Sequence, residues 1–151
     1  MFIKRYLLFV SLIFIALFIA ACGGTNAPIV SQSTSEDIFS LPKNAKGYID
    51  ISVDQLAPAM TNKDFTLVNV HIPYAGDLPQ TDVSIPFNEI EANLNQLPSD
   101  KDARIVVYCR SGNMSAQASQ TLVNLGYANV VDVNGGMVAW QAAGNELITK
   151  Q

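Results

Sequence analysis

The chain has 151 residues, of which 49% are apolar and 15% charged, and this length allows one domain of ordinary size. Its formal net charge of −4 gives no general electrostatic attraction for nucleic acid or anionic lipid, which excludes both as default partners. Two cysteines and one histidine are too few for a disulfide framework or for a zinc site without carboxylate ligands, so no metal is expected.

The N-terminus has the layout of a secretory signal: residues 1–5 are short and basic, residues 6–20 are almost entirely apolar, and small residues precede Cys22. The motif Ile19-Ala20-Ala21-Cys22 resembles the lipobox of bacterial lipoproteins, although that pattern prefers Leu where Ile19 stands. The resemblance implies a signal peptide over residues 1–21, a lipidated Cys22 and an extracytoplasmic, membrane-anchored protein on the periplasmic or cell-surface side. The alternative is an uncleaved anchor, but about 15 apolar residues are short for a spanning helix, which needs about 20.

The next segment, residues 22–46, is predicted to be a flexible tether. It is rich in Gly, Ser and Pro and shows no periodicity of 2 or 3.6 residues. Its least coil-like part is residues 36–39. Such a spacer would hold a domain, expected over residues 47–151, away from the membrane.

Within this domain, three short runs rich in valine and isoleucine predict β-strands. They cover residues 66–70, 104–108 and 129–133. Continuous runs of this kind suit strands that are covered on both faces, as in a parallel sheet.

Two helices are predicted before the second of these runs. Ser52 and Gln55 form a capping-box pattern for the first helix, and Pro58 would keep that helix short or kinked. Helical spacing predicts a second, closed by Pro98, from the apolar residues Phe87, Ile90, Leu94 and Leu97.

Two further helices complete the pattern. An apolar stripe at Ala118, Leu122 and Leu125 predicts a helix that ends at Gly126, and residues 136–143 predict another. The alternation of strands and helices indicates an open α/β sheet with helices on both faces.

Cys109 directly follows the most apolar predicted strand, at the carboxyl edge of the sheet where ligands bind in such folds. A short loop containing Gly112 then leads into a helix, which would turn several backbone N–H groups toward one point. That geometry stabilises a thiolate, and Arg110 adds a nearby positive charge. The alternative is a buried core cysteine, a common role for a free thiol.

The stretch Ile105-Val-Val-Tyr-Cys109-Arg-Ser-Gly-Asn113 resembles the active-site segment of single-domain rhodaneses, the thiosulfate sulfurtransferase family. Three other pieces resemble the family in order: residues 48–52, residues 83–86, and a closing section from Gly126 to Trp140. The resemblance implies a rhodanese-like fold with a sheet of about five mainly parallel strands flanked by helices.

The resemblance also implies that Cys109 is catalytic and accepts sulfane sulfur as a persulfide. The donor would be thiosulfate, a polysulfide or a persulfide, and the acceptor a thiol or cyanide. No cofactor is implied, and we expect a monomer. The substrate would be held by the residues that follow the cysteine, Arg110, Ser111, Gly112, Asn113, Met114 and Ser115.

The chain departs from the family pattern at three places. Met114 stands where the family's six-residue loop usually ends in arginine, which should weaken binding of an anionic donor. Asn69 and His71, possible walls of the site, stand in a motif that is often Asp-Val-Arg. The connection over residues 72–82 is short, and its Asp77 and Asp82 are expected to be solvated.

Two other functions remain open at this point. One is a non-catalytic rhodanese-like module that binds a partner, although such a module would have no need of Cys109. The other is a cysteine-dependent phosphatase, whose loop requires arginine at the position of Ser115. For His71, a hydrogen-bonded structural role competes with a role as wall or base.

Overall fold

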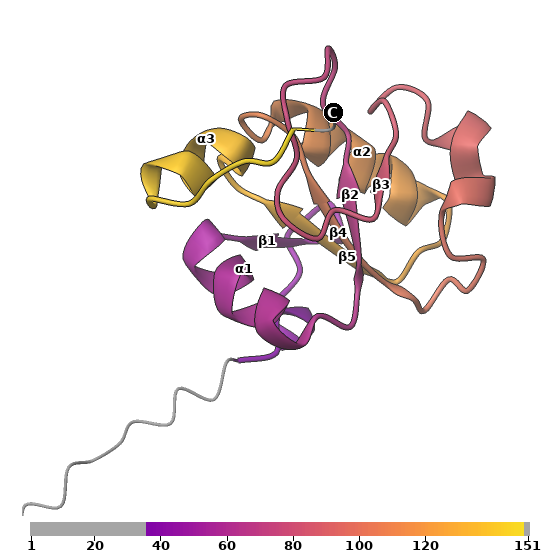
Figure 1. The fold of residues 1–151 in the computed structure, drawn as a ribbon. Coiled ribbons are helices and arrows are strands. Elements are labelled where there is room, and N and C mark those ends of the chain that lie inside the picture. Colours follow the sequence, from indigo (N-terminus) through magenta and orange to yellow (C-terminus); the bar gives the residue numbers. More distant parts are fainter. Residues whose placement is uncertain (1–35, 150–151) are drawn as a thin grey trace, which may run out of the picture. The chain divides into compact units, whose positions relative to one another are not determined.

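The computed structural model describes residues 36–149. Five strands, three α-helices and three short 3-10 helices (η) follow one another along this part of the chain (Figure 1). In order they are η1 Ile38–Ser40, β1 Ile49–Ile51, α1 Val53–Ala59, η2 Met60–Asn62, β2 Thr66–Asn69, β3 Val83–Ser84, η3 Glu91–Gln96, β4 Arg104–Tyr108, α2 Asn113–Asn124, β5 Asn129–Val133 and α3 Gly136–Ala142.

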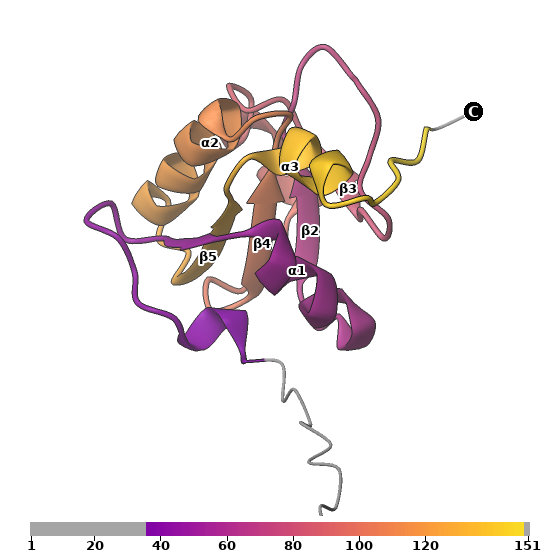
Figure 2. The same cartoon turned by 90° about the vertical axis from the view of Figure 1, so that its left-hand side faces the viewer.

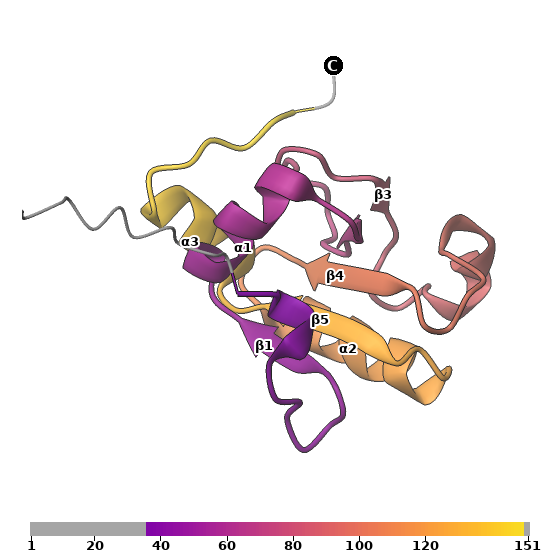
Figure 3. The same cartoon turned by 90° about the horizontal axis from the view of Figure 1, so that it is seen from below.

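The strands form one parallel sheet in the order β1-β5-β4-β2-β3. Helix α2 covers one face, whereas α1 and α3 cover the other (Figure 2, Figure 3). The predicted fold class, an open α/β sheet of five mainly parallel strands, is therefore confirmed.

The central strands β4 and β5 divide the core into two layers. Alternate residues of β4 point to opposite faces: Val106 and Tyr108 pack with α1 and α3, and Ile105 and Val107 pack with α2. Burial on both faces explains why these strands are almost continuously apolar. The bounds of both strands match the sequence prediction.

Helix α1 confirms the predicted capping box. The Gln55 amide donates to Ser52 Oγ at 3.3 Å, and Gln55 Oε1 accepts from the Ser52 amide at 2.9 Å. Pro58 lies in the last turn, and the helix ends at Ala59 before continuing as η2. The helix is short, as predicted.

The predicted helix from Phe87 to Leu97 is wrong. The Phe87 amide donates to the carbonyl of Val70 at 3.1 Å, so Phe87 is still bonded to the edge of the sheet. Only the 3-10 helix η3 follows, and it is kinked at Asn93, whose φ is −117°. The apolar spacing serves core packing without an α-helix, since Ile90 and Leu97 are both buried.

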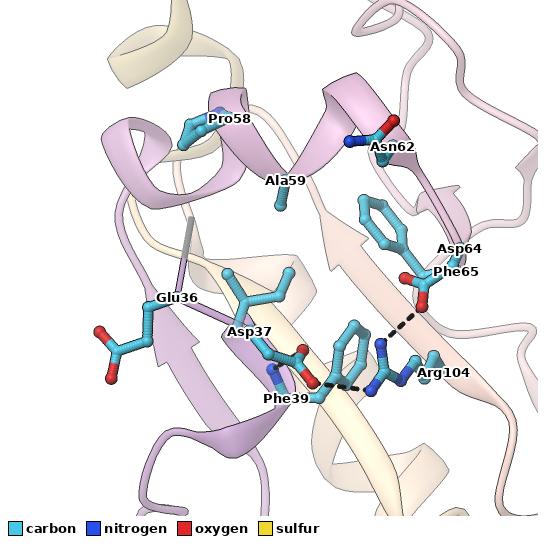
Figure 4. Close-up of a pocket in the computed structure, with 10 residues that line it drawn as sticks. Glu36, Asp37, Phe39, Pro58, Ala59, Asn62, Asp64, Phe65 and Arg104 are labelled. Atoms are coloured by element: carbon cyan, nitrogen blue, oxygen red, sulfur yellow. Dashed lines mark hydrogen bonds and ion pairs between the residues drawn. The ribbon is translucent and has the colours of Figure 1, made fainter. Parts of the chain in front are cut away.

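The last residues of the predicted tether pack on the domain instead. Ile38 is buried in the core layer beneath α1, because an isoleucine and a phenylalanine in this segment have apolar surface to remove from water. Asp37 accepts from Arg104 at 2.7 Å, and Arg104 also donates to Asp64 at 2.6 Å (Figure 4). The folded unit therefore begins ahead of Gly47.

Residues 1–35, including the predicted signal peptide and Cys22, lie outside the described residues. Between residues 36 and 149, no helix has both the length and the apolar character needed to cross a membrane.

Candidate active site

Cys109 lies directly beyond β4, at the carboxyl edge of the sheet. Its Sγ accepts a hydrogen bond from the Gly112 amide at 3.1 Å. Gly112 has a φ of 99°, a left-handed conformation that glycine adopts without steric cost, and this turn brings its N–H back toward the sulfur. The loop then enters α2 at Asn113.

The start of α3 holds the same loop through backbone hydrogen bonds. The amides of Met137 and Val138 donate to the carbonyls of Cys109 and Arg110, both at 3.0 Å. Gly136 lies so close that a Cβ atom there would overlap the Cys109 carbonyl oxygen. Backbone contacts between the cysteine loop and the start of α3, which are distant in sequence, therefore fix the position of the sulfur.

The remaining loop residues divide into exposed and buried positions. Arg110, Ser111 and Asn113 are exposed beside the cysteine, and Met114 is half-buried against the core layer under α2. Ser115 is fully buried, and its hydroxyl donates to the Gly112 carbonyl at 3.1 Å. Ser115 therefore supports the loop from within.

Asn69, suggested by the sequence as a wall of the site, is a buried residue that holds the connection after β2. Its amide donates to Gly76 O at 3.0 Å and to Asp77 Oδ1 at 2.8 Å, and its carbonyl oxygen accepts from the His71 amide at 3.0 Å. The side chain holds Gly76 and Asp77 of this connection against the end of β2.

His71 continues β2 next to the continuation of β4, since the Val70 amide donates to the Tyr108 carbonyl at 2.9 Å. Burial lowers the pKa of His71, and the positive charge of Arg110 lowers it further. Both effects favour the neutral form of the His71 imidazole. Its Nδ1 is buried without a hydrogen-bond partner among residues 36–149.

The expectation that Asp77 is solvated is wrong, because this residue is fully buried. Tyr74 and Asn69 donate to its carboxylate at 2.9 and 2.8 Å, and the Tyr108 hydroxyl lies 3.3 Å from it. Asp82, by contrast, is half-exposed and accepts from Lys63 at 2.6 Å. The hydroxyl of Tyr108, directly after the aliphatic residues 105–107, was the available sequence signal of a buried polar partner.

Asp132 is a second buried carboxyl that sequence reasoning missed. It lies in β5, is 1% exposed, and faces the same layer as α2. Burial raises its pKa to about 7. A charged residue inside the run Val130-Val-Asp-Val133 was the signal that could have identified it.

The site places one buried thiol against one backbone donor, the Gly112 amide. Cys109 is a free cysteine, and its Sγ accepts from the Gly112 amide directly ahead of the first residue of α2. Within residues 36–149, no three His, Cys, Asp or Glu side chains are grouped so that they could hold a metal ion. The arrangement suits nucleophilic chemistry at sulfur.

A cavity of about 170 Å³ lies elsewhere, at the amino edge of the sheet. Phe39, Phe65 and Arg104 are among the residues that line it (Figure 4). Arg104 opens β4 and Cys109 follows its end, so strand β4 separates this cavity from the sulfur.

Comparison with known proteins identifies the family to which this fold belongs. The family model of the rhodanese-like domain matches residues 47–143. A sulfurtransferase of Allochromatium vinosum is 32% identical over 92 residues, covering 59% of this chain and 83% of that protein. Thiosulfate sulfurtransferase PspE of Escherichia coli is 27% identical over 90 residues, covering 60% and 86% of the two chains.

Among solved structures, a rhodanese-related protein from Thermoplasma volcanium superimposes with a TM-score of 0.59 and 29% identity. The match covers 68% of this chain and 100% of that one. The family match spans all five strands and all three α-helices described above. This chain therefore belongs to the rhodanese-like domain family.

Proposed function

We propose that this protein is a sulfurtransferase or persulfide carrier in which Cys109 accepts sulfane sulfur and passes it to a thiophilic acceptor. The observation that carries the proposal is the hydrogen bond of 3.1 Å from the Gly112 amide to Cys109 Sγ. A core cysteine in an apolar layer needs no such donor, whereas a thiolate or persulfide anion does.

The transfer occurs in two balanced steps. The Cys109 thiolate attacks the outer sulfur of thiosulfate, the sulfur–sulfur bond of the donor breaks, and sulfite leaves with the electron pair. An acceptor nucleophile such as cyanide then attacks the terminal sulfur of the Cys109 persulfide and restores the thiolate. A polysulfide donor reacts in the same way and leaves one sulfur shorter, and neither route requires an external oxidant.

The loop favours a weakly charged donor over thiosulfate. Arg110 is the one cationic residue between Cys109 and Ser115, and Met114 has neither a charge nor a hydrogen-bond donor. A doubly charged donor therefore lacks a charge-assisted contact worth about 1.5–3 kcal/mol. We infer low thiosulfate activity and better loading from polysulfide or from a persulfide.

The direct test is mass spectrometry of the Cys109 peptide after the purified chain has been exposed to thiosulfate or polysulfide. We expect an adduct of about 32 Da, one sulfur atom, on this peptide. Peptide mapping separates Cys109 from Cys22, and Cys109→Ser is the control. If the chain never carries the adduct, the remaining candidate is a non-catalytic binding role. The 1% exposure of Cys109 would fit that role.

We also propose that the protein is anchored outside the cytoplasm through a lipid on Cys22. The support is the order of basic residues, apolar segment and lipobox in residues 1–22. Cys22→Ser should abolish partitioning of the processed protein into detergent. If the serine variant is processed and remains in the membrane like the parent, the lipid anchor is refuted.

A further inference from the structure

A hollow of about 460 Å³ lies on the exposed side of α2 and begins at the cysteine loop. It is lined by Lys46, Asn113, Ala116, Gln117 and Gln120. The last four residues follow one another at i, i+3, i+4 and i+7, so they form a single stripe along the helix. Asn113 directly follows Gly112, whose amide donates to Cys109 Sγ at 3.1 Å. One end of the hollow therefore lies next to the active-site loop.

The turn ahead of β1 forms the opposite wall of the hollow. Gln120 Nε2 donates to the Lys46 carbonyl at 3.3 Å, and a Cβ atom at Gly47 would lie 3.0 Å from the side chain of Val123. These contacts seat the turn against α2. They place the backbone of Lys46 beside Gln120, which lies about 10 Å along the helix axis from Asn113.

The hollow carries positive charge in a chain that is acidic as a whole. Lys46 is exposed and forms no ion pair among residues 36–149. None of the described residues that line the hollow is Asp or Glu, although the net charge of the chain is −4. A negatively charged group is therefore attracted to the end of the hollow that is remote from Cys109.

The amide side chains along the stripe offer both acceptors and donors. Gln117 Nε2 donates to Asn113 Oδ1 at 2.8 Å, and Gln120 Nε2 donates to Asn124 Oδ1 at 3.1 Å. With the glutamine nitrogens engaged in this way, the Oε1 atoms of both glutamines are left as acceptors and Asn113 Nδ2 is left as a donor. This combination matches the N–H and C=O groups of a peptide.

We propose that this hollow binds a free peptide thiol of about three residues, with its sulfur toward Cys109 and its terminal carboxylate on Lys46. The inference rests on the proposed function of Cys109 and names the class of its sulfur donor. Three extended residues span about 10 Å, the distance from Asn113 to Gln120 along the helix. The volume of the hollow is in the range typical of sites for small ligands.

The donor is the persulfide of this peptide thiol. The Cys109 thiolate attacks its outer sulfur, the sulfur–sulfur bond of the donor breaks, and the peptide leaves as a thiolate with the electron pair. The transferred sulfur keeps its hydrogen, so Cys109 becomes a persulfide without any oxidant. Neither Arg110 nor an arginine at position 114 is needed to hold this donor, because its charge lies at the far end of the hollow.

The first test compares two donors in the purified full chain. They are the persulfide of a tripeptide with an N-terminal cysteine and two glycines, and the same persulfide with its C-terminus amidated. We expect the carboxylate form to load Cys109 about three- to tenfold faster, the effect of one exposed charged contact. Mass spectrometry of the Cys109 peptide over time gives both rate constants.

The preference for the carboxylate should depend on Lys46. Lys46→Gln should bring the ratio of the two rate constants close to one. Lys43→Gln, the matched control, removes an equal charge three residues away and should keep the ratio of the parent chain, because Lys43 Nζ donates to the Ala128 carbonyl at 2.7 Å and does not line the hollow. An equal ratio in Lys46→Gln and the parent chain would overturn the inference.

A second measurement needs no sulfur transfer. The S-methylated tripeptide, which cannot react, is titrated into the full chain while the side-chain amide signals of Asn113, Gln117 and Gln120 are followed by NMR. These signals should shift, and Gln117→Glu should weaken binding about three- to tenfold, because its carboxylate repels that of the ligand. Signals that stay unchanged, or equal binding by Gln117→Glu, would refute the peptide site. Binding without loading of Cys109 would instead refute the proposed sulfur transfer.

Discussion

The two edges of the sheet are held by different kinds of interaction. At the carboxyl edge, backbone amides of Met137 and Val138 bond the cysteine loop, and the fit leaves no room for a Cβ at Gly136. At the amino edge, Arg104 forms ion pairs with Asp37 and Asp64, which are 43% and 63% exposed (Figure 4). Substitutions that disturb close backbone contacts are expected to cost much stability, whereas exposed ion pairs in water contribute little to the free energy of unfolding. The difference predicts where substitutions will matter.

The largest effect is expected from Gly136→Ala. Its Cβ would overlap the Cys109 carbonyl oxygen, and its φ of 49° is a left-handed value that already disfavours alanine. We expect a loss of about 3–5 kcal/mol in the free energy of unfolding by denaturant titration, together with lost sulfur loading. Gly144→Ala is the matched control, because its φ is 83° and no atom lies within 4 Å of the new Cβ. If Gly136→Ala lost only as much stability as the control, about 1–2 kcal/mol, the cysteine loop and the start of α3 would be able to move apart without cost.

Asp132 predicts a pH dependence of stability. Its pKa is raised from 3.8 to about 7 in the folded state. Below pH 4 the carboxyl is protonated in both states. Between pH 4 and 7 only the unfolded chain releases the proton, so this group lowers stability as the pH rises.

Asp132→Asn should therefore gain stability relative to the parent chain as the pH rises from 4 to 7. The gain above pH 7 is expected on the order of 2–4 kcal/mol, measured as the difference between denaturation curves of the two proteins. Carboxyl groups that do not interact with Asp132 cancel in that difference, whereas Asp50, whose charge raises the pKa of Asp132, contributes to it. A difference that does not vary with pH would show that Asp132 ionises in the folded protein as it does in the unfolded chain.

Sequence reasoning succeeded where the signal lies within one element and failed where a feature depends on residues distant in the chain. The bounds of β4 and β5 were predictable because their valine and isoleucine runs are burial signals contained within the strand. The Ser52 capping box was equally local. The position of Cys109 at the end of β4 followed from the same reasoning.

What could not be predicted depends on partners distant in the chain. The burial of Asp77 depends on Tyr108, 31 residues away, and Ile38 becomes core only because the sheet supplies a surface for it. Helical spacing misled at Phe87, since its amide is bonded to the carbonyl of Val70, directly after β2. The bracing of Cys109 by α3 is likewise a backbone contact between segments, and side-chain patterns carry no sign of it.

At the sulfur itself, Met114→Arg should raise kcat/KM for thiosulfate about ten- to hundredfold. One charge-assisted contact of about 1.5–3 kcal/mol, expressed fully in the transition state, corresponds to that range. The measurement is steady-state formation of thiocyanate from thiosulfate and cyanide. Met114→Leu, similar in size and uncharged, should leave the rate unchanged, and Cys109→Ser should remove the activity in both backgrounds. Equal kinetics in the arginine and leucine variants would mean that the missing charge does not limit the donor step.

The smallest effect is expected at the amino edge, from Asp64→Asn. This change removes the pair of 2.6 Å with Arg104, but Asp64 is 63% exposed, so we expect between 0 and about 1 kcal/mol of stability, less at high salt. Asp37→Asn should cost more, because Asp37 Oδ1 also accepts from the Phe39 amide at 3.1 Å and caps η1. Denaturation curves at low and high salt measure both losses, and alkylation of Cys109 should be unchanged in both variants. If Asp64→Asn altered that alkylation rate, the amino edge would be coupled to the sulfur through β4, and the two edges of the sheet would not be independent.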